Sequence, residues 1–322
     1  IFETGGLVSC PVDKPVLDAA LNMSGVVKRF GRRTALDGLS LTVPAGSAFG
    51  LVGSNGAGKT TAMSVVAGIM QSNEGSIDLL DEGPFDARVH SGRVSLMPQD
   101  AELPLHARIC DLMGFYARLQ GIPGREIAER VEEVLRWVHL SDRARSKIRA
   151  LSHGMRRRLV IAQAFLGSPE LALLDEPLSG LDPKEVVSMR ELLKRRPRRQ
   201  TLIISSHNLH EIERICDHVA FIEEGRVVHQ GLTDAVTGRS HAMHYRLVSD
   251  PLPLDALADA LPDADFEWRQ NDSTLVCNYP HTTHNAEQVN ARVLRVLIDQ
   301  GIGVSEVRRG DELEAAYLNH SA

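Results

Sequence analysis

One run of eight residues, Gly53–Thr60, constrains this chain more than any other part of it. Its letters, GSNGAGKT, fit the pattern G-x-x-x-x-G-K-[ST] at every fixed position. The apolar run 48–52 before it predicts a buried strand, and residues 61–67 after it can continue as a helix. A glycine-rich loop in that context directs backbone N–H groups and a helix N-terminus at phosphate oxygens. The alternative is a glycine-rich turn with a surface lysine. The context instead favours a nucleoside triphosphate site, with Lys59 at the β- and γ-phosphates and Thr60 on Mg²⁺.

Composition excludes several other classes of protein. The net charge of −6 over 322 residues argues against a general nucleic-acid coat, so we expect no nucleic-acid partner. The four cysteines are isolated and form no C-x-x-C pair, so neither zinc nor a disulfide framework is indicated, and the thiols suit a reducing cytosol. No apolar run approaches the length of a transmembrane helix, and residues 1–22 lack the apolar core of a signal peptide.

Hydrophobic patterning predicts an α/β chain with a second, smaller domain. Residues 1–22 carry glycines and prolines, and we expect them to be a poorly ordered lead-in. Strands are predicted at 23–29, 36–43, 48–52, 75–80, 92–97, 171–175, 201–206, 219–222 and 226–228. Residues 104–168 have helical periodicity, broken near Gly121, which predicts an all-helical insertion. The two apolar runs at 171–175 and 201–206 are continuous, as central parallel strands are.

The last part of the chain predicts a separate fold. The composition of residues 235–241, AVTGRSH, is no longer that of a strand or helix, and we place a linker there. The pattern then predicts strands at 243–248, 264–269, 273–278 and 303–308, and helices at 253–261, 285–300 and from 311. The order strand-helix-strand-strand-helix-strand indicates a ferredoxin-like α+β domain.

A second acidic element accompanies the phosphate loop. Asp175 ends the apolar strand 171–175, where its carboxylate can hold Mg²⁺ directly or through water. Glu176 follows at once and is placed to polarise a water that attacks the γ-phosphate. A strand that happens to end in two acids is the alternative, and the phosphate loop makes it weak.

Further motifs occur in one fixed order. Leu151–Met155 opens an arginine-rich helix, Ser179–Pro183 follows the acidic strand, His207 ends the next apolar strand, and Gln99 follows the strand near 94–97. In kind and order these resemble the ATP-binding cassette (ABC) ATPases over residues 23–235. The resemblance implies a P-loop cassette with a RecA-like core sheet, an antiparallel β-subdomain and a helical subdomain at about 101–168. The C-terminal domain would then occupy 242–322.

The resemblance also implies a role for each matching residue. Phe30 matches the aromatic that stacks on adenine, although alone it would be predicted as core. The phosphate loop that holds ATP comprises Gly53, Ser54, Asn55, Gly56, Ala57, Gly58, Lys59, Thr60 and Thr61. Gln99 matches the glutamine that senses Mg²⁺ and γ-phosphate and links to a membrane partner.

The remaining matches concern hydrolysis and a second subunit. Asp175 and Glu176 match the metal-binding acid and the catalytic base. His207 matches the histidine at the γ-phosphate; without its neighbours it would be an ordinary strand-end histidine. The resemblance implies that Ser152 and Gly154 cap the γ-phosphate of an opposing subunit and that Asp182 lies at the dimer interface. The physical argument for Ser152 is that it begins a helix, whose N-terminus attracts anions.

Three residues depart from the family pattern. His153 replaces a glycine, Met155 stands where glutamine is frequent, and Leu178 replaces a small polar residue. None of these changes removes a catalytic group, so we expect an active ATPase.

The chain also carries two basic runs, Arg156–Arg158 and Lys194–Arg199. The first lies just inside the helix that Leu151–Met155 opens, and this stretch matches the signature motif of the family. For the second, cations at a helix C-terminus complement its dipole, and a solvated face is favoured over contact with anionic lipid.

Together these features predict the ATPase subunit of an ABC transporter at the cytoplasmic face of a membrane. We expect two copies to sandwich ATP and separate permease subunits to span the membrane. The stretch Asp111–Ile122 and the ending Leu313–Leu318 resemble exporter cassettes of the ABC-2 class, which favours export.

A soluble cassette ATPase acting on DNA or the ribosome is the alternative, but such proteins usually carry two cassettes or a long coiled coil. A non-catalytic regulatory subunit is disfavoured because Glu176 and His207 are present.

Overall fold

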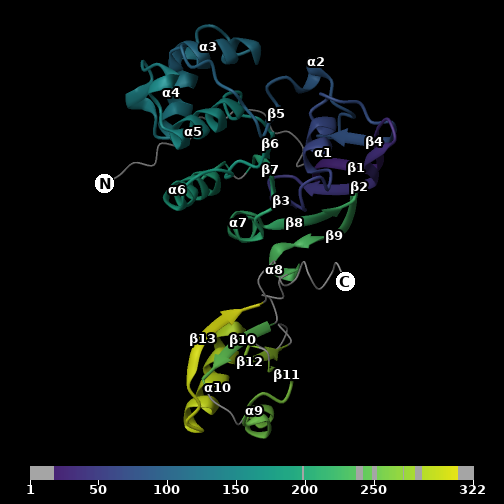
Figure 1. Cartoon of the computed structure of the whole chain (residues 1–322), viewed down its shortest axis with the longest axis vertical. Coiled ribbons are helices and arrows are strands. Elements are labelled where there is room, and N and C mark those ends of the chain that lie inside the picture. Colours follow the sequence, from purple (N-terminus) through teal and green to yellow (C-terminus); the bar gives the residue numbers. More distant parts are fainter. Residues whose placement is uncertain are drawn as a thin grey trace. The chain divides into compact units, whose positions relative to one another are not determined.

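The backbone separates into two units, Ile1–Gln230 and Gly231–Ala322 (Figure 1). The computed structural model describes residues 18–197, 199–236, 242–248, 252–270, 272–279 and 285–310. Most of the linker expected at 235–241 and the helix expected from 311 lie outside these ranges.

A six-stranded sheet with the order β5-β6-β7-β3-β8-β9 forms the centre of the first unit. Its strands are β3 (Ala48–Val52), β5 (Val94–Met97), β6 (Leu171–Asp175), β7 (Thr201–Ser206), β8 (His218–Glu223) and β9 (Arg226–Leu232). In the sheet order, the first five strands, β5-β6-β7-β3-β8, pair in parallel. Every residue of β3, β6 and β7 is buried, which explains why these sequences are mostly apolar; polar residues such as Asp175, Ser205 and Ser206 come at the ends of β6 and β7. Because parallel strands end at one edge, the segments that follow β3, β5, β6 and β7 meet there.

A second sheet is antiparallel, with the order β2-β1-β4. Its strands are β1 (Ala19–Phe30), β2 (Arg33–Pro44) and β4 (Glu74–Leu79). The expectation that the poorly ordered lead-in extends to residue 22 is wrong for residues 19–22, because Leu21 is buried and pairs with Val43 and Leu79. Three consecutive buried residues begin β1, so this stretch lacks the alternation that marks a half-buried strand. Residues 1–17 lie outside the described ranges.

Three helices of the first unit form a group of their own. The insertion predicted at 104–168 contains α3 (Ile109–Leu119), α4 (Ile127–Trp137) and α5 (His153–Ala164), which lie together and apart from β1, β2 and β4 (Figure 1). The other α-helices of the first unit are α1 (Lys59–Val66), α2 (Ala87–His90), α6 (Pro183–Lys194) and α7 (Leu209–Ile215), while α8 (Thr233–Val236) lies in the second unit.

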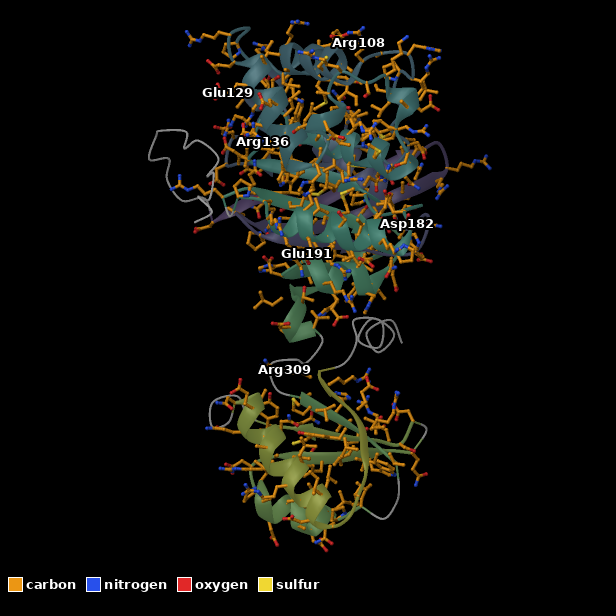
Figure 2. The ribbon with its side chains drawn as sticks, turned by 90° about the vertical axis from the view of Figure 1, so that its left-hand side faces the viewer. Arg108, Glu129, Arg136, Asp182, Glu191 and Arg309 are labelled. Carbon is orange, nitrogen blue, oxygen red and sulfur yellow. The ribbon has the colours of Figure 1, made fainter. Side chains whose placement is uncertain are left out.

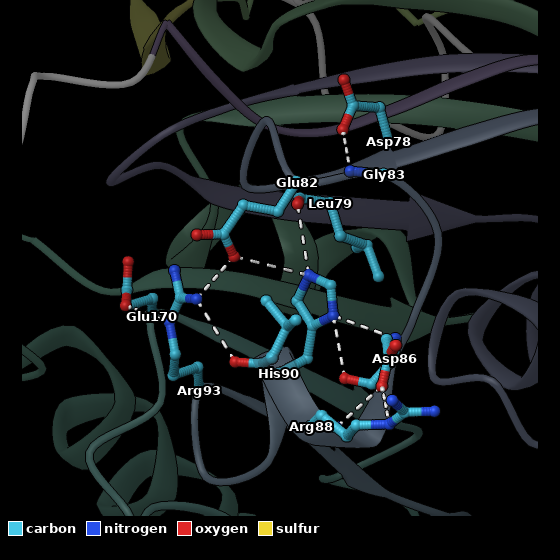
Figure 3. Close-up of polar contacts among 10 residues, drawn as sticks. Asp78, Leu79, Glu82, Gly83, Asp86, Arg88, His90, Arg93 and Glu170 are labelled. Carbon is cyan, nitrogen blue, oxygen red and sulfur yellow. Dashed lines mark hydrogen bonds and ion pairs between the residues drawn. The ribbon is translucent and has the colours of Figure 1, made fainter.

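A buried histidine anchors the connection between β4 and β5 (Figure 3). The His90 side chain is fully buried, and its Nδ1 accepts the Asp86 backbone N–H at 3.0 Å. Nearby, Arg93 contacts Glu82 at 2.5 Å and Glu170 at 2.7 Å, and these carboxylates raise the pKa of its guanidinium. The cluster fixes the start of β5 to the start of β6, and so helps to place Gln99 beyond the end of β5.

The second unit has the predicted ferredoxin-like order. It contains β10 (Ala242–Leu247), α9 (Leu254–Ala260), β11 (Asp265–Arg269), β12 (Thr274–Asn278), α10 (Ala286–Asp299) and β13 (Val304–Arg309). The strands form one antiparallel sheet, β11-β12-β10-β13. Tyr245, Leu275 and Val293 are fully buried in a core that the sheet shares with the helices. A capping box between Asn285 and Gln288 begins α10.

The close packing of α7 on β3 gives a stability prediction. A Cβ at Gly50 would lie 2.2 Å from Cγ2 of the buried Ile212 side chain. We expect Gly50→Ala to lower the free energy of unfolding by about 1–3 kcal/mol through overpacking. Thermal denaturation measures the change. Gly124→Ala is the matched control, because a Cβ there meets nothing within 4 Å; equal stabilities of the two variants would contradict the packing argument.

Candidate functional site

A cavity of about 420 Å³ lies where the phosphate loop meets the edge of the core sheet. Its walls come from the β1–β2 hairpin, the loop before α1, the start of α1 and the segments after β5 and β6. The lining residues are Phe30, Arg33, Ala35, Asn55, Gly56, Gly58, Lys59, Thr60, Thr61, Gln99 and Glu176. Segments far apart in sequence are therefore brought to one site, as the motif order predicted.

Close packing requires two of the loop glycines, Gly53 and Gly58. Gly58 has φ of 114°, and a Cβ there would lie 2.7 Å from the Ala35 carbonyl oxygen. A Cβ at Gly53 would lie 2.4 Å from the Ile222 carbonyl oxygen. Gly53, Ser54 and Ala57 belong to the loop but do not line the cavity, whereas the other predicted loop residues do.

Lys59 lies with its ammonium group inside the loop. Its Nζ donates to the carbonyl oxygens of Gly53 at 2.7 Å and Ser54 at 3.2 Å, and it is 3.9 Å from Glu176 Oε1. Burial lowers the pKa of Lys59, while the charges of Glu176 and Asp175 act in the opposite direction. A desolvated ammonium at the cavity wall is a strong site for a phosphate group.

Glu176 is held in an unusual backbone conformation. Its φ is 48°, in the left-handed region that costs a non-glycine residue about 1–2 kcal/mol. The Glu176 N–H donates to Ser205 Oγ at 2.9 Å, and Ser205 Oγ in turn donates to Asp175 Oδ1. His207 Nδ1 lies 3.0 Å from both oxygens of the Glu176 carboxylate. His207 thus contacts the proposed base, and neither His207 nor Asp175 lines the cavity itself.

The oxygen groups near the cavity suit a magnesium ion. Thr60 offers a hydroxyl and Gln99 an amide oxygen at the wall, and Asp175 adds a buried carboxylate at the end of β6. Mg²⁺ prefers hard oxygen ligands and is often bound through one or two protein groups and the substrate phosphates. This donor set fits the ion.

Phe30 is an exposed wall of the cavity, so the alternative that it belongs to the core is wrong. Its side chain is 47% exposed, and Lys28 Nζ lies 5.3 Å from the ring centroid. Arg33 lines the same cavity, although no motif in the sequence pointed to it. A signal was nevertheless available, since the tight turn at Gly31 pairs Arg33 with Phe30 across β1 and β2.

Ser152, Gly154 and Asp182 do not line the cavity. Ser152 caps α5 by accepting the Met155 N–H at 3.2 Å. Asp182 caps α6 by accepting the Glu185 N–H at 2.9 Å, and its side chain lies at the surface of the first unit (Figure 2). A Cβ at Gly154 would overlap the Glu185 carboxylate, so the starts of α5 and α6 pack directly against each other.

The basic runs contain partly buried guanidinium groups. Arg157 donates to the carbonyl oxygens of Gln99, Glu176 and Pro177, a function that the sequence pattern did not reveal. Arg196 donates to the carbonyl oxygens of Gln200 at 3.2 Å and Gly46 at 3.3 Å, and burial lowers its pKa. The second run therefore includes a structural arginine as well as exposed cations.

Comparisons with known proteins agree with this geometry. The profile of the family described as "ABC transporter" matches residues 36–179. The chain is 36% identical over 264 residues to a "Nod factor export ATP-binding protein I" of Ralstonia nicotianae, covering 80% of each chain. A protein of the same name from Paraburkholderia xenovorans is 32% identical over 94% of this chain and 96% of its own. The chain belongs to the ATP-binding proteins of the ABC transporter family.

Solved ABC cassettes have the same fold. The chain is 26% identical to cbiO1 of Clostridium perfringens, described as part of the ABC transporter complex cbiONQ, with a TM-score of 0.62 over 69% of this chain and 92% of that one. An ATP-binding subunit of an ABC transporter is 25% identical with a TM-score of 0.60. This ABC protein is thus an ATP-binding ATPase. Among the residues that the structure describes, no helix is both long and apolar enough to cross a bilayer.

The lowered pKa of Lys59 predicts a pH dependence of ATP binding. Below its pKa, Lys59 is charged and attracts phosphate. Because this pKa is lowered from 10.5, Lys59 in the free protein begins to lose its proton in a pH window that starts below that value. ATP binding must restore that proton, so affinity should fall as pH rises through this window. Calorimetry in buffers of different ionisation enthalpy should show proton uptake. Lys59→Arg stays charged and should lack the slope; an equal slope in that variant would contradict the assignment.

Proposed function

We propose that this ABC protein hydrolyses Mg²⁺-bound ATP between two copies of itself and thereby powers export through separate membrane subunits. The observation that carries the proposal is the cavity, which is lined by the phosphate loop, Gln99 and Glu176 together. Ser152 and Gly154, which match the family's capping residues, do not line this cavity. Relatives named for Nod factor export support the direction of transport.

The site chemistry follows from the positions of its groups. Loop N–H groups and Lys59 bind the phosphates, and Phe30 stacks on the base. Glu176 accepts a proton from the attacking water, and His207 keeps the carboxylate oriented toward the cavity through its Nδ1 contact. Mg²⁺, held by Thr60 with Asp175 and Gln99, would neutralise charge on the phosphates when bound.

Replacing the proposed base tests the chemical step. We expect Glu176→Gln to lower ATP turnover by about 100–1,000-fold because the amide cannot take the proton. ATP binding should persist, since Lys59 and the loop are unchanged, and the ATP-bound dimer should accumulate. Phosphate release, nucleotide titration and size-exclusion chromatography measure the three effects. Turnover like that of the native protein would refute the assignment of Glu176.

The expected ATP sandwich explains why the cavity lacks the signature residues. Ser152 caps the N-terminus of α5, and its hydroxyl accepts the Met155 N–H while its own hydrogen remains available to a phosphate. The helix N-terminus adds partial positive charge at the same point. We propose that this end of α5 meets the γ-phosphate bound by a second copy, with Asp182 at the interface.

Mixed dimers test the composite site. Ser152→Arg and Lys59→Ala chains should each be inactive alone. Mixing them should restore one native site in each heterodimer, because one chain then supplies the phosphate loop and the other the signature. ATP turnover is measured against the mixing ratio. Absence of any recovery, with heterodimers shown to form, would contradict the composite arrangement.

An exposed apolar strip on α3 is the surface that we propose for the membrane subunits. Phe115 and Leu119 lie one helical turn apart and are 51% and 63% exposed. A cavity of about 670 Å³ between α3 and α4 is lined in part by Gly114 and Arg118, which precede these two residues in the chain. The strip falls within Asp111–Ile122, the stretch that resembles exporter cassettes. This partner would hold the protein at the cytoplasmic face of the membrane.

Polar substitution of the strip tests this contact. We expect Phe115→Ser with Leu119→Ser to abolish sedimentation with membranes while ATP binding stays unchanged. Ile298→Ser, equally exposed on α10, is the control and should sediment as the native protein does. Native-like sedimentation of the double variant would refute this surface. If the native protein stays in the soluble fraction, a soluble ABC ATPase acting on DNA or the ribosome becomes the better interpretation.

A further inference from the structure

Arg157 links three parts of the site that are distant in sequence. It lies in the first turns of α5, five residues after Ser152. Its Nη1 donates to the Gln99 carbonyl oxygen at 3.0 Å, its Nε to the Pro177 carbonyl oxygen at 3.0 Å, and its Nη2 to the Glu176 carbonyl oxygen. A guanidinium has rigid, divergent donors, so one side chain can hold three carbonyl groups at once.

The carbonyl of Glu176 is the most informative of these partners. Glu176 has a left-handed backbone, and its peptide groups must be held in that orientation by bonds to neighbours. Ser205 holds the N–H side, and His207 contacts the carboxylate. On the carbonyl side, the Ser179 N–H donates from within the same turn at 3.2 Å, and Arg157 donates from a separate element. Arg157 therefore ties the turn to α5.

Arg157 differs from an ordinary surface cation in its environment. Its side chain is partly withdrawn from solvent, and desolvation lowers the pKa of the guanidinium while Asp100, Asp175 and Glu176 act against that effect. Arg157 does not line the cavity, so it is not placed to bind ATP itself. A partly desolvated cation that donates to backbone carbonyls fixes the loops that carry them.

We propose that Arg157 is a positioning residue for hydrolysis, which holds Glu176 and the Gln99 loop in their working arrangement from the signature helix. The inference rests on the proposed role of Glu176 as base. It adds a connection within one chain, because Ser152 at the start of α5 would meet the ATP of the second copy while Glu176 acts on the ATP of its own loop. Arg157 then couples the contact of Ser152 with the ATP of the second copy to hydrolysis of the ATP in its own chain's site.

Kinetics of substituted proteins test this assignment. Arg157→Ala should lower kcat by about 30–100-fold, as expected when a reacting group is misplaced, with the Kd for ATP nearly unchanged. Arg156→Ala is the matched control on the same helix, because the three carbonyls are bonded by Arg157 and not by Arg156, and we expect kcat close to native. A kcat within about threefold of native for Arg157→Ala would overturn the proposal.

Two further measurements separate positioning from general stability. Free guanidinium at about 50 mM should restore part of the turnover of Arg157→Ala and none of that of Glu176→Gln. If Arg157→Ala fails to fold, Arg157→Lys keeps the charge without the planar fork and should show an intermediate kcat. Native kcat in Arg157→Lys, or no rescue of folded Arg157→Ala, would overturn the proposal. Full activity in Glu176→Gln would instead refute the proposed function.

Discussion

The left-handed backbone at Glu176 is the constraint on which the site depends. With an ordinary β-conformation at this residue the carboxylate would point in another direction, and the left-handed turn directs it to the cavity beside Lys59. The strain persists because bonds from Ser205, Arg157 and His207 fix the residue from separate elements. The conformation at the end of β6, where Glu176 lies, is therefore determined by β7 and α5 as much as by β6 itself.

The parallel core sheet explains how these elements meet. Its strands end at one edge, so the phosphate loop after β3, Gln99 after β5, Glu176 after β6 and His207 after β7 become neighbours. Helix α5 reaches the same edge from the helical group and supplies Arg157. Since the same helix begins just after Ser152, one element contacts the chain's own site and carries the signature that a second copy would use. This geometry suits a protein that acts as a dimer.

Much of this arrangement could be predicted because it follows from local pattern. The glycine loop has a fixed spacing, and buried parallel strands such as β6 have continuous apolar sequences. The start of β1 was missed because its residues do not alternate. Arg157 could not be found, since its partners are backbone carbonyls 19, 20 and 58 residues away and carry no residue-specific signal. Arg33 was predictable from the Gly31 turn, once β1 and β2 were paired.

The central claim is that each cavity is half of a site which a second copy completes. A structure of the full chain with Mg²⁺ and a non-hydrolysable ATP analogue tests it most directly. The account predicts two chains, with each γ-phosphate between Lys59 of one copy and Ser152 of the other. A structure in which the analogue fills the cavity of a single chain, with Ser152 facing solvent and no second copy at the phosphate, would contradict it.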